Sequence, residues 1–317
     1  RRFGVQVPVG PQMSSHSYIS NPKNEDIYIN INGELFHRNE AKISVFDSGF
    51  LLGDGVWEGI RLHKSSLVFI ENHLDRLFSS AQGISLDIPY SKQGIIDEIN
   101  KVLDKNKMKD NIHIRLVISR GDKITPYQNP NANLGPINLV IIPEYKKTNP
   151  NTYLKGINIG RVPNVRPNES ILSPHYNTLS KLNCILASIE ANKLGYDEGI
   201  MNDMNGNIST CNSTNLFFIK NKKVLTSTGE YCLNGITRAK AILVCKQNNI
   251  LCSETNFIFE DIKNCNEAFV TGTFAGIIPV SKLEGRKLES TNPNSLVNKI
   301  RDLYNQEIQN YIEKHEN

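Results

Sequence analysis

The sequence lacks the features that mark membrane, disulfide-rich and nucleic-acid-binding proteins. Its 317 residues include only six cysteines; none forms a Cys-x-x-Cys pair, and no histidine stands at zinc-ligand spacing from one. No apolar run is long enough to cross a bilayer. The basic residues are scattered and the net charge is only +4, which speaks against nucleic acid as a partner. We therefore expect a reduced, cytoplasmic protein without a metal site, a membrane partner or a nucleic-acid partner.

The residues that are present suit a packed enzyme. Hydrophobic residues make up 39% of the chain and charged residues 21%, so a large core is feasible. The length fits one large domain or two of ordinary size. Residues 1–12 carry charges but no apolar segment, unlike a secretory signal. We expect them to be an added or disordered leader before a native start at Met13, with a short transit remnant as the alternative.

Strand and helix signals fall into two blocks separated by a polar segment at residues 146–153, which predicts a linker. Asn32-Gly33 between alternating residues predicts a hairpin over 27–35. Strands and helices do not alternate strictly, so we expect an α+β fold with a small N-terminal domain, residues 13–148, and a larger C-terminal domain, residues 149–317. The other predicted strands cover residues 42–46, 53–61 with an extension over 68–70, 112–119, 137–142, 156–162, 198–201, 216–219, 223–225 and 268–272, and the predicted helices cover 72–81, 91–108, 181–194, 235–248 and 295–313.

Three motifs each suggest a group that binds an anion. Gly235-Ile236-Thr237 runs from a loop into a helix, whose first amides are free to bind a negative charge. Thr271-Gly272-Thr273 follows a predicted strand, and Arg76 on a predicted helix is able to bind a phosphate bidentately. Taken singly, an ordinary helix start, a polar turn and a solvated arginine explain them as well. A sugar-phosphate or nucleotide binder also fits, although neither a GxGxxG loop nor a P-loop is present.

The order of these motifs resembles one family. The strings LGDGVWEGIRLH, ENHLDRL, IRLVISRG, LASIEANKLGYDEGIM, TNLFFI, YCLNGITRAKA and FVTGTFAGIIPV follow one another over roughly residues 27–288. Together they resemble the class IV aminotransferases, the fold-type IV pyridoxal-phosphate enzymes that include branched-chain and D-amino acid aminotransferases. The resemblance implies a two-domain D-amino acid aminotransferase-like fold, pyridoxal 5'-phosphate as cofactor, and a homodimer with the site at the domain and subunit interface.

The resemblance also implies roles for individual residues. Arg76 matches the arginine that grips the cofactor phosphate. Arg115 matches a position that holds a substrate carboxylate in some members, and Trp57 matches an aromatic residue of the substrate pocket. The other residues that match cofactor-binding positions of the family are Gly235, Ile236, Thr237, Gly272 and Thr273 around the phosphate, and Thr210 at the pyridine ring.

The sequence departs from the family pattern at two places. Aligned without gaps, Asn177 stands where the family has its Schiff-base lysine; one or two extra residues would put Tyr176 or His175 there instead. The only lysine of this segment is Lys181, in the place of a tyrosine that touches the cofactor in many members. Thr210 replaces a glutamate beside the pyridine nitrogen, so a neutral hydroxyl stands where a carboxylate would keep the ring protonated.

These departures leave three hypotheses open. In the first, Lys181 is a relocated Schiff-base lysine, and the protein is a pyridoxal-phosphate enzyme that transaminates small amino acids or amines with a 2-oxo acid; lyase chemistry is its variant. In the second, Schiff-base chemistry is lost and the protein is a lyase or hydrolase using His175, Cys184 or Cys211, or a binder of a phosphate ligand. In the third, it is a degenerate structural subunit. We expect the first, with Lys181 as the catalytic residue.

Overall fold

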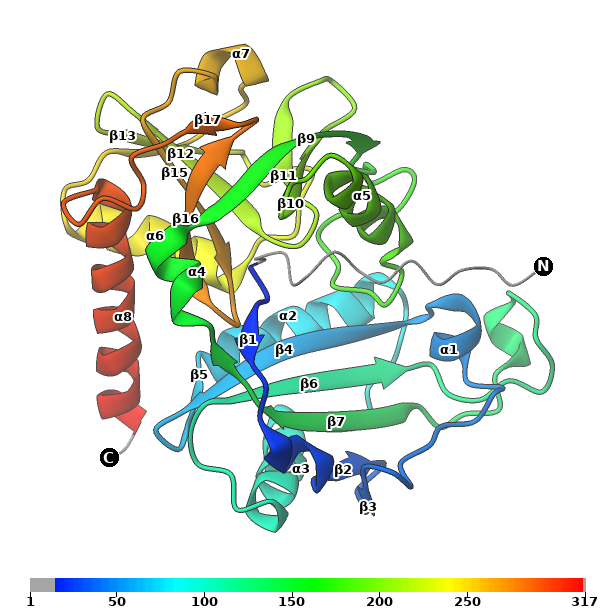
Figure 1. Cartoon of the computed structure of the whole chain (residues 1–317). Helices are drawn as coiled ribbons and strands as arrows, with labels where there is room; N and C mark the ends of the chain where they lie inside the picture. The colour runs from blue at the N-terminus through cyan, green and yellow to red at the C-terminus, as the bar shows by residue number, and fades with distance from the viewer. Residues whose placement is uncertain (1–14, 316–317) are drawn as a thin grey trace, which may run out of the picture.

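Two β-sheets organise the chain, and each is built from one half of the sequence (Figure 1). The computed structural model describes residues 15–315. Residues 28–145 form a six-stranded sheet and residues 157–287 form a nine-stranded sheet. The α+β class is confirmed. The expected leader over residues 1–12 and the start at Met13 lie outside the described residues, and the division into two domains near residue 148 stays a prediction that the two sheets support.

The six-stranded sheet is antiparallel throughout, in the order β3-β2-β7-β6-β4-β5. Its first hairpin turns at Asn32 and Gly33, which both have positive φ (55° and 86°), so the hairpin prediction is confirmed. Helices α2 and α3 bury Leu74, Leu77 and Ile95 against the sheet. The elements are η1 Pro22–Glu25, β2 Tyr28–Ile31, β3 Glu34–His37, α1 Ser48–Leu52, β4 Gly55–His63, β5 Ser66–Val68, α2 Ile70–Gly83, α3 Lys92–Lys105, β6 Ile112–Ser119, η2 Pro130–Ala132 and β7 Asn138–Tyr145.

The nine-stranded sheet mixes parallel and antiparallel pairs, in the order β11-β10-β9-β16-β15-β12-β13-β14, with β17 beside β16. A pair of short strands, β1 Tyr18–Ile19 and β8 Lys147–Thr148, lies where the chain passes between the two sheets. The elements of this half are α4 Pro150–Lys155, β9 Ile157–Val165, α5 Leu182–Lys193, β10 Glu198–Asn202, β11 Ile208–Cys211, β12 Asn215–Lys220, β13 Lys223–Thr226, α6 Ile236–Gln247, β14 Cys252–Glu254, α7 Phe259–Ile262, β15 Glu267–Gly272, β16 Gly276–Leu283, β17 Arg286–Lys287 and α8 Leu296–His315.

The two halves share part of their core. Helix α8 runs beside both lobes in Figure 1. Its buried Ile300, Tyr304 and Ile308 pack in one cluster with Phe69, which follows β5 of the smaller sheet. The Phe69 ring lies 4.9 Å from the ring of Tyr311 between centroids, at a steep angle. The C-terminal helix therefore fastens the smaller sheet to the larger one.

Three sequence predictions are wrong. The strand expected over residues 68–70 ends at Val68, and Ile70 already begins helix α2. Residues 42–46 form no strand, because no neighbouring strand offers hydrogen bonds there; the segment leads as a loop into α1. Residues 146–153 are not a plain linker, since they contain β8 and the start of α4. Asn149 caps α4 by accepting from the amide of Asn151, and Pro150 occupies its first turn. The polar residues that suggested a loop are thus partly those of a helix start.

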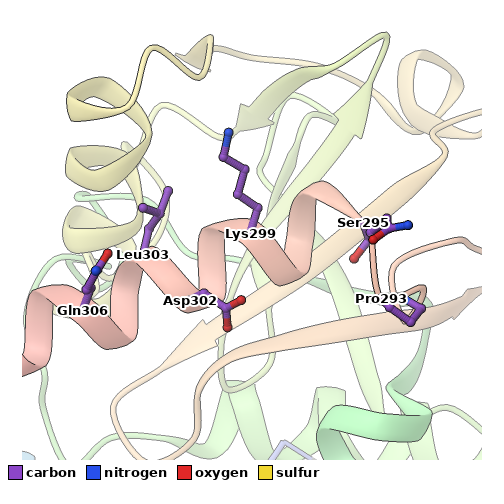
Figure 2. A pocket seen from close by; sticks show the side chains of 7 residues that line it. Pro293, Ser295, Lys299, Asp302, Leu303 and Gln306 are labelled. Atoms are coloured by element: carbon purple, nitrogen blue, oxygen red, sulfur yellow. The ribbon is translucent and has the colours of Figure 1, made fainter.

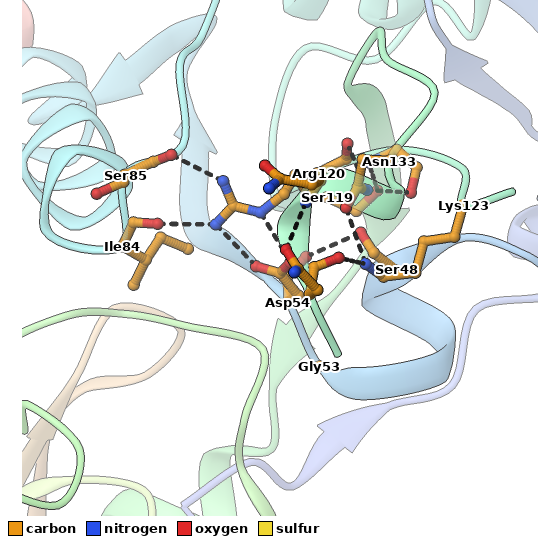
Figure 3. Close-up of polar contacts among 12 residues, drawn as sticks. Ser48, Gly53, Asp54, Ile84, Ser85, Ser119, Arg120, Lys123 and Asn133 are labelled. Carbon is orange, nitrogen blue, oxygen red and sulfur yellow. Dashed lines mark hydrogen bonds and ion pairs between the residues drawn. The ribbon is translucent and has the colours of Figure 1, made fainter. Parts of the chain in front are cut away.

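An ion pair fixes the end of the smaller sheet next to α1 (Figure 3). Arg120 donates to both carboxylate oxygens of Asp54, at 2.8 and 3.0 Å. The same guanidinium donates to the carbonyl oxygens of Ile84 and Ser85, each at 2.7 Å. Through Arg120, Asp54 in the turn before β4 is therefore connected to the residues that follow α2.

None of the described helices is both long and apolar enough to cross a membrane.

Candidate active site

One cavity of about 480 Å³ draws its walls from both sheets. Strands β4 and β6 contribute from the smaller sheet, and α6 and the β15–β16 turn contribute from the larger half. All ten residues that the sequence singled out line this one cavity: Trp57, Arg76, Arg115, Lys181, Thr210, Gly235, Ile236, Thr237, Gly272 and Thr273. More than two hundred positions separate the first of these residues from the last in the sequence, so it is the fold that brings them together.

The start of α6 forms one end of the cavity. Gly235 is its N-cap residue, and no side chain caps the first amides of the helix. A Cβ atom at Gly235 would lie 2.3 Å from Oδ1 of Asn215, so only glycine fits the approach. Asn215 in turn holds the loop by donating to the carbonyl of Leu233 at 2.9 Å. The free amides face the cavity with a partial positive charge and suit an anion.

The end of β15 and the turn after it add hydroxyl groups to the same cavity. Thr271 is only 2% exposed, and its Oγ1 is buried without a hydrogen-bond partner. Gly272 and Thr273 follow it along the cavity wall. An unpaired buried hydroxyl is costly unless something else completes it. A ligand with several acceptor oxygens at this end satisfies that requirement.

Arg76 reaches the cavity from α2 and is held by a buried carboxylate. Its Nε and Nη2 donate to the two oxygens of Glu58 at 2.7 and 2.8 Å, and Nη1 donates to the carbonyl of Asn234 at 3.2 Å. Glu58 is fully buried and is also 2.7 Å from Nδ1 of His73. Although burial opposes it, the charge of Arg76 and the bonds from Arg76 and His73 lower the pKa of Glu58 to about 2. The guanidinium is thus fixed, with two N–H groups left for a ligand.

The segment before α5 is anchored to β4. The amide of Trp57 donates to the carbonyl of Asn177 at 2.9 Å, and Nδ2 of Asn177 donates back to the carbonyl of Trp57 at 2.7 Å. Asn177 is 1% exposed and lines the cavity, whereas His175 and Tyr176 do not. The Asn177 Oδ1 is buried without a partner. Of the three alternative positions that the sequence left open, Asn177 is the one at the cavity.

Lys181 lies at the start of α5, as its N-cap residue. Its Nζ is 5.7 Å from the centre of the Trp57 ring. Burial lowers the pKa of Lys181 to about 8; Cys184 and Glu58 oppose this shift, and the positive charges of Arg166 and Arg76 add to it. At pH 7 about a tenth of the amine is then neutral, far more than for an exposed lysine. A lysine of this kind is a better nucleophile and proton acceptor than one in water.

Comparison with known proteins identifies the family. The model of class IV amino-transferases matches residues 55–283, which is more than half of the chain. The chain belongs to the class IV aminotransferase family. The matched region contains every cavity residue that the sequence predicted, so the family resemblance is confirmed. Enzymes of this family use pyridoxal phosphate, which confirms the expected cofactor.

Three relatives show how far the similarity extends. The chain is 35% identical over 287 residues to branched-chain-amino-acid aminotransferase-like protein 1 of Arabidopsis thaliana, covering 89% of this chain and 51% of that protein. It is 32% identical over 277 residues to a putative branched-chain-amino-acid aminotransferase of Methanocaldococcus jannaschii, covering 87% of this chain and 94% of that one. It shares its fold with a branched-chain aminotransferase of Thermoproteus uzoniensis solved with norvaline, at a TM-score of 0.81 and 26% identity over 92% of this chain and 97% of that chain. The chain spans about half the length of the curated plant relatives it matches.

Thr210 is held in the cavity wall by a hydrogen bond to the backbone. Its Oγ1 donates to the carbonyl of Thr214 at 2.7 Å, so the hydroxyl has only acceptor capacity left. Thr214 in turn donates through Oγ1 to the buried Glu198 at 2.5 Å. Thr210 is therefore fixed by the backbone and offers a neutral oxygen to the cavity.

The other candidate nucleophiles in this class IV cavity are less suited to catalysis. Burial raises the pKa of the Cys211 thiol well above its usual range, so it stays protonated. His175 lies outside the cavity, 3.3 Å from Glu169. Cys184 lines the cavity and accepts a hydrogen bond from Nη1 of Arg166 at 3.0 Å.

Sequence reasoning missed four basic side chains of the cavity. These are His16, His113, Lys146 and Arg166. His113 stands two residues before Arg115 on β6, so alternation along the strand was a usable signal. Nothing in the sequence placed His16 or Lys146, because only the pairing of β1 with β8 brings them near the cavity.

A second hollow lies on the surface of α8 (Figure 2). It is lined by the turn before α8 and by the helix itself. In Figure 2 the side chains of Lys299 and Asp302 point to opposite sides of the helix. They do not converge on a ligand, so we assign this hollow no role in the class IV activity.

Proposed function

We propose that the protein is a pyridoxal-phosphate enzyme that transaminates small amino acids or amines with a 2-oxo acid. One observation carries the proposal: the cavity combines an anion-binding end with Lys181, whose pKa burial lowers to about 8. The family to which the chain belongs supports the reaction type. The relatives of matching length are called aminotransferases as well.

The residues present fit the phosphate of the cofactor. The free amides at Gly235 and Ile236, the unpaired hydroxyl of Thr271 and the fixed guanidinium of Arg76 all lie along one end of the cavity. A phosphate dianion accepts several hydrogen bonds at once and offsets positive charge. Thr237 and Thr273 complete this phosphate site in our proposal. These residues would hold the cofactor by its phosphate, and Thr210 lines the same cavity.

Lys181 performs the proton transfers in this proposal. When bound, pyridoxal phosphate supplies an electron-withdrawing ring that weakens the bonds to the carbon next to the amino group. The amine of Lys181, with its pKa near 8, would hold the cofactor by its aldehyde end and would accept and return the substrate proton. Trp57 and Arg115 border the substrate, with the Arg115 guanidinium carbon 3.7 Å from the centre of the Trp57 ring.

The deciding experiment is borohydride reduction of the protein saturated with pyridoxal phosphate, followed by peptide mass mapping. We expect one pyridoxyl group on the peptide that contains Lys181, and none at this place in Lys181→Ala. Lys193→Ala is the matched control, since Lys193 lies exposed at the other end of the same helix. Reduction without a site-specific adduct, with cofactor still retained, would replace the proposal by the second hypothesis, a catalyst or binder of phosphate ligands without covalent lysine chemistry.

We further propose that two copies of the chain associate through the face of α5. Leu182, Ile185, Leu186 and Ile189 of this helix are 67%, 52%, 46% and 42% exposed. Phe50 of α1 is 66% exposed, and Ser180 just before α5 donates to the carbonyl of Gly53 at the end of α1. The two helices therefore offer neighbouring apolar surface, which monomers rarely expose.

The state of the cysteines supports a cytoplasmic location in this proposal. All six cysteines are unpaired in the described residues, as expected for a reducing compartment. Fractionation of cells that produce the protein would check this, and recovery from an oxidising compartment with disulfides would contradict it.

A further inference from the structure

Asn177 carries a hydrogen-bond acceptor that no described residue satisfies. The residue is 1% exposed and lines the cavity between the two sheets. Its amide donates to Oγ of Ser80 at 3.0 Å, and its carbonyl and its Nδ2 are both bonded to the backbone of Trp57. Its Oδ1 is buried and has no partner among residues 15–315. A buried acceptor in this state costs free energy that a donor on a ligand would recover.

The bond to Trp57 fixes the direction of this carboxamide. A carbonyl oxygen only accepts, so the group that meets the Trp57 carbonyl at 2.7 Å must be the Nδ2 donor of Asn177, and Oδ1 must face away from it. The backbone that follows is also held along β4: Thr178 bridges to that strand, and the amide of Leu179 donates to the carbonyl of Gly55 at 2.9 Å. A rotation of the side chain would therefore break an existing bond to satisfy the free acceptor.

The charged side chains of the cavity suit a different kind of ligand group. Among the described lining residues these are all positive: Arg76, Arg115, Lys146, Arg166 and Lys181. The phosphate and carboxylate oxygens that bind such cations are acceptors, so they cannot bond to Oδ1 of Asn177. The ligand group that completes Asn177 must be a donor.

The two forms of a transaminase cofactor differ in this respect. Pyridoxal 5'-phosphate carries an aldehyde, whose oxygen only accepts, whereas pyridoxamine 5'-phosphate carries at the same carbon an amino group that donates. In the proposed function this carbon comes to Lys181. Asn177 precedes Lys181 by four residues, and both meet Trp57, one through its backbone and the other with Nζ 5.7 Å from the centre of its ring. The amino group therefore comes to the side of the cavity on which Asn177 lies.

We propose that Oδ1 of Asn177 binds the amino group of pyridoxamine 5'-phosphate, so that the chain binds the aminated cofactor more tightly than a form without a donor at the same carbon. The inference rests on the proposed function for the cofactor itself, because it needs the phosphorylated pyridine ring in the cavity. It does not need the Lys181 adduct, since a hydrogen bond holds the amino group without covalent chemistry.

Two probes isolate this hydrogen bond. Pyridoxamine 5'-phosphate and 4'-deoxypyridoxine 5'-phosphate share the ring and the phosphate, and the second has a methyl group where the first has an aminomethyl group. Neither carries an aldehyde, so neither forms an adduct with Lys181 that would add to its affinity. Equilibrium dialysis of the full chain against each probe gives the two affinities without any turnover.

We expect pyridoxamine 5'-phosphate to bind about tenfold more tightly than the deoxy probe, the effect of about one hydrogen bond. In Asn177→Ala the two probes should bind equally, whereas Asn177→Asp keeps an acceptor oxygen and should retain the preference. Asn183→Ala is the matched control and should behave like the original chain. Nδ2 of Asn183 also donates to a strand carbonyl, that of Val165 at 3.1 Å, and its Oδ1 also has no described partner, but the residue does not line the cavity.

Equal affinities of the unchanged chain for the two probes, or a preference that survives in Asn177→Ala, would overturn the inference. If Asn177→Ala does not fold, the unchanged chain and Asn177→Asp still decide it. A pyridoxamine preference without a Lys181 adduct would remove the proposed role of Lys181 and leave the Asn177 site standing. A Lys181 adduct without that preference would do the reverse.

Discussion

Glu58 shows how one buried residue supports the site without lining the cavity. From the sequence alone it is only a polar residue on a strand edge, since alternation along β4 does not reveal a partner on α2. The structure buries it completely and binds it to Arg76 and His73. A carboxylate between a cation and a histidine holds Arg76 in the orientation that leaves two N–H groups toward the cavity.

Replacing Glu58 by glutamine should lower the free energy of unfolding by about 3 kcal/mol at pH 7, because Arg76 stays buried without its counter-charge. The pKa of Glu58 is about 2 in the folded chain against an ordinary 4.5. Its contribution is thus fully present above about pH 4.5 and is lost as the pH falls toward 2. Urea unfolding at a series of pH values measures this. Glu58→Gln should lack that part of the acid dependence, whereas Glu40→Gln at an exposed position should keep it.

Thr210 tests whether the missing carboxylate limits the reaction. Thr210→Glu should raise the rate of transamination severalfold, because the family resemblance puts this residue at the pyridine nitrogen and a carboxylate there favours the protonated ring. Thr210→Gln has the same size as the glutamate variant without the charge and should bring no gain. Steady-state rates with an amino acid and a 2-oxo acid give the answer. A glutamate variant that folds, retains cofactor and gains nothing would mean that the neutral residue is not what limits the reaction.

At the level of helices and strands, the sequence was most informative where the signal is local. Asn32-Gly33 specifies its hairpin by backbone conformation alone, and the glycine at the start of α6 marks a helix whose first turn is free. Predictions failed where an element depends on a neighbour. The apolar residues at 42–46 form no strand because no neighbouring strand pairs with them. Helix α4 was not predicted because its sequence consists largely of residues that are typical of turns.

The first turn of α6 carries the prediction about cofactor retention. Thr237 is 3% exposed and lines the cavity. Thr237→Ala should weaken binding of pyridoxal phosphate about tenfold, the effect of about one hydrogen bond. Thr237→Ser keeps the hydroxyl and should bind within about twofold of the original chain. Equilibrium dialysis against pyridoxal phosphate measures both; unchanged binding by the alanine variant would argue against the phosphate site at α6.

At the scale of the whole molecule, assembly of the cavity could not be predicted from local pattern. The family resemblance was enough to name ten residues that line one cavity. It did not reveal His16 or Lys146, which reach the cavity through the pairing of β1 with β8. Arg166 was also missed. It follows β9 and contacts Cys184 on α5, and the sequence gives no sign that these two segments lie close together.

Association of two copies is the prediction that belongs to this scale. The double substitution Leu182→Glu and Ile185→Glu puts two charges on the apolar face of α5 and should convert a dimer into a monomer. Leu154→Glu changes an equally exposed leucine on α4 and should leave the dimer intact. Light scattering after size-exclusion chromatography gives the masses. A single mass near 35.7 kDa for the unchanged chain would rule out the dimer at once.

The fastening of the smaller sheet by α8 has a consequence for synthesis on the ribosome. Phe69 emerges early, but the residues that cover it, such as Tyr304 and Tyr311, are translated more than two hundred codons later. Until then this aromatic ring has no native neighbour from the last helix. The nascent N-terminal half is therefore a substrate for chaperones that bind exposed apolar segments, and it reaches its final packing only after the last helix has left the exit tunnel.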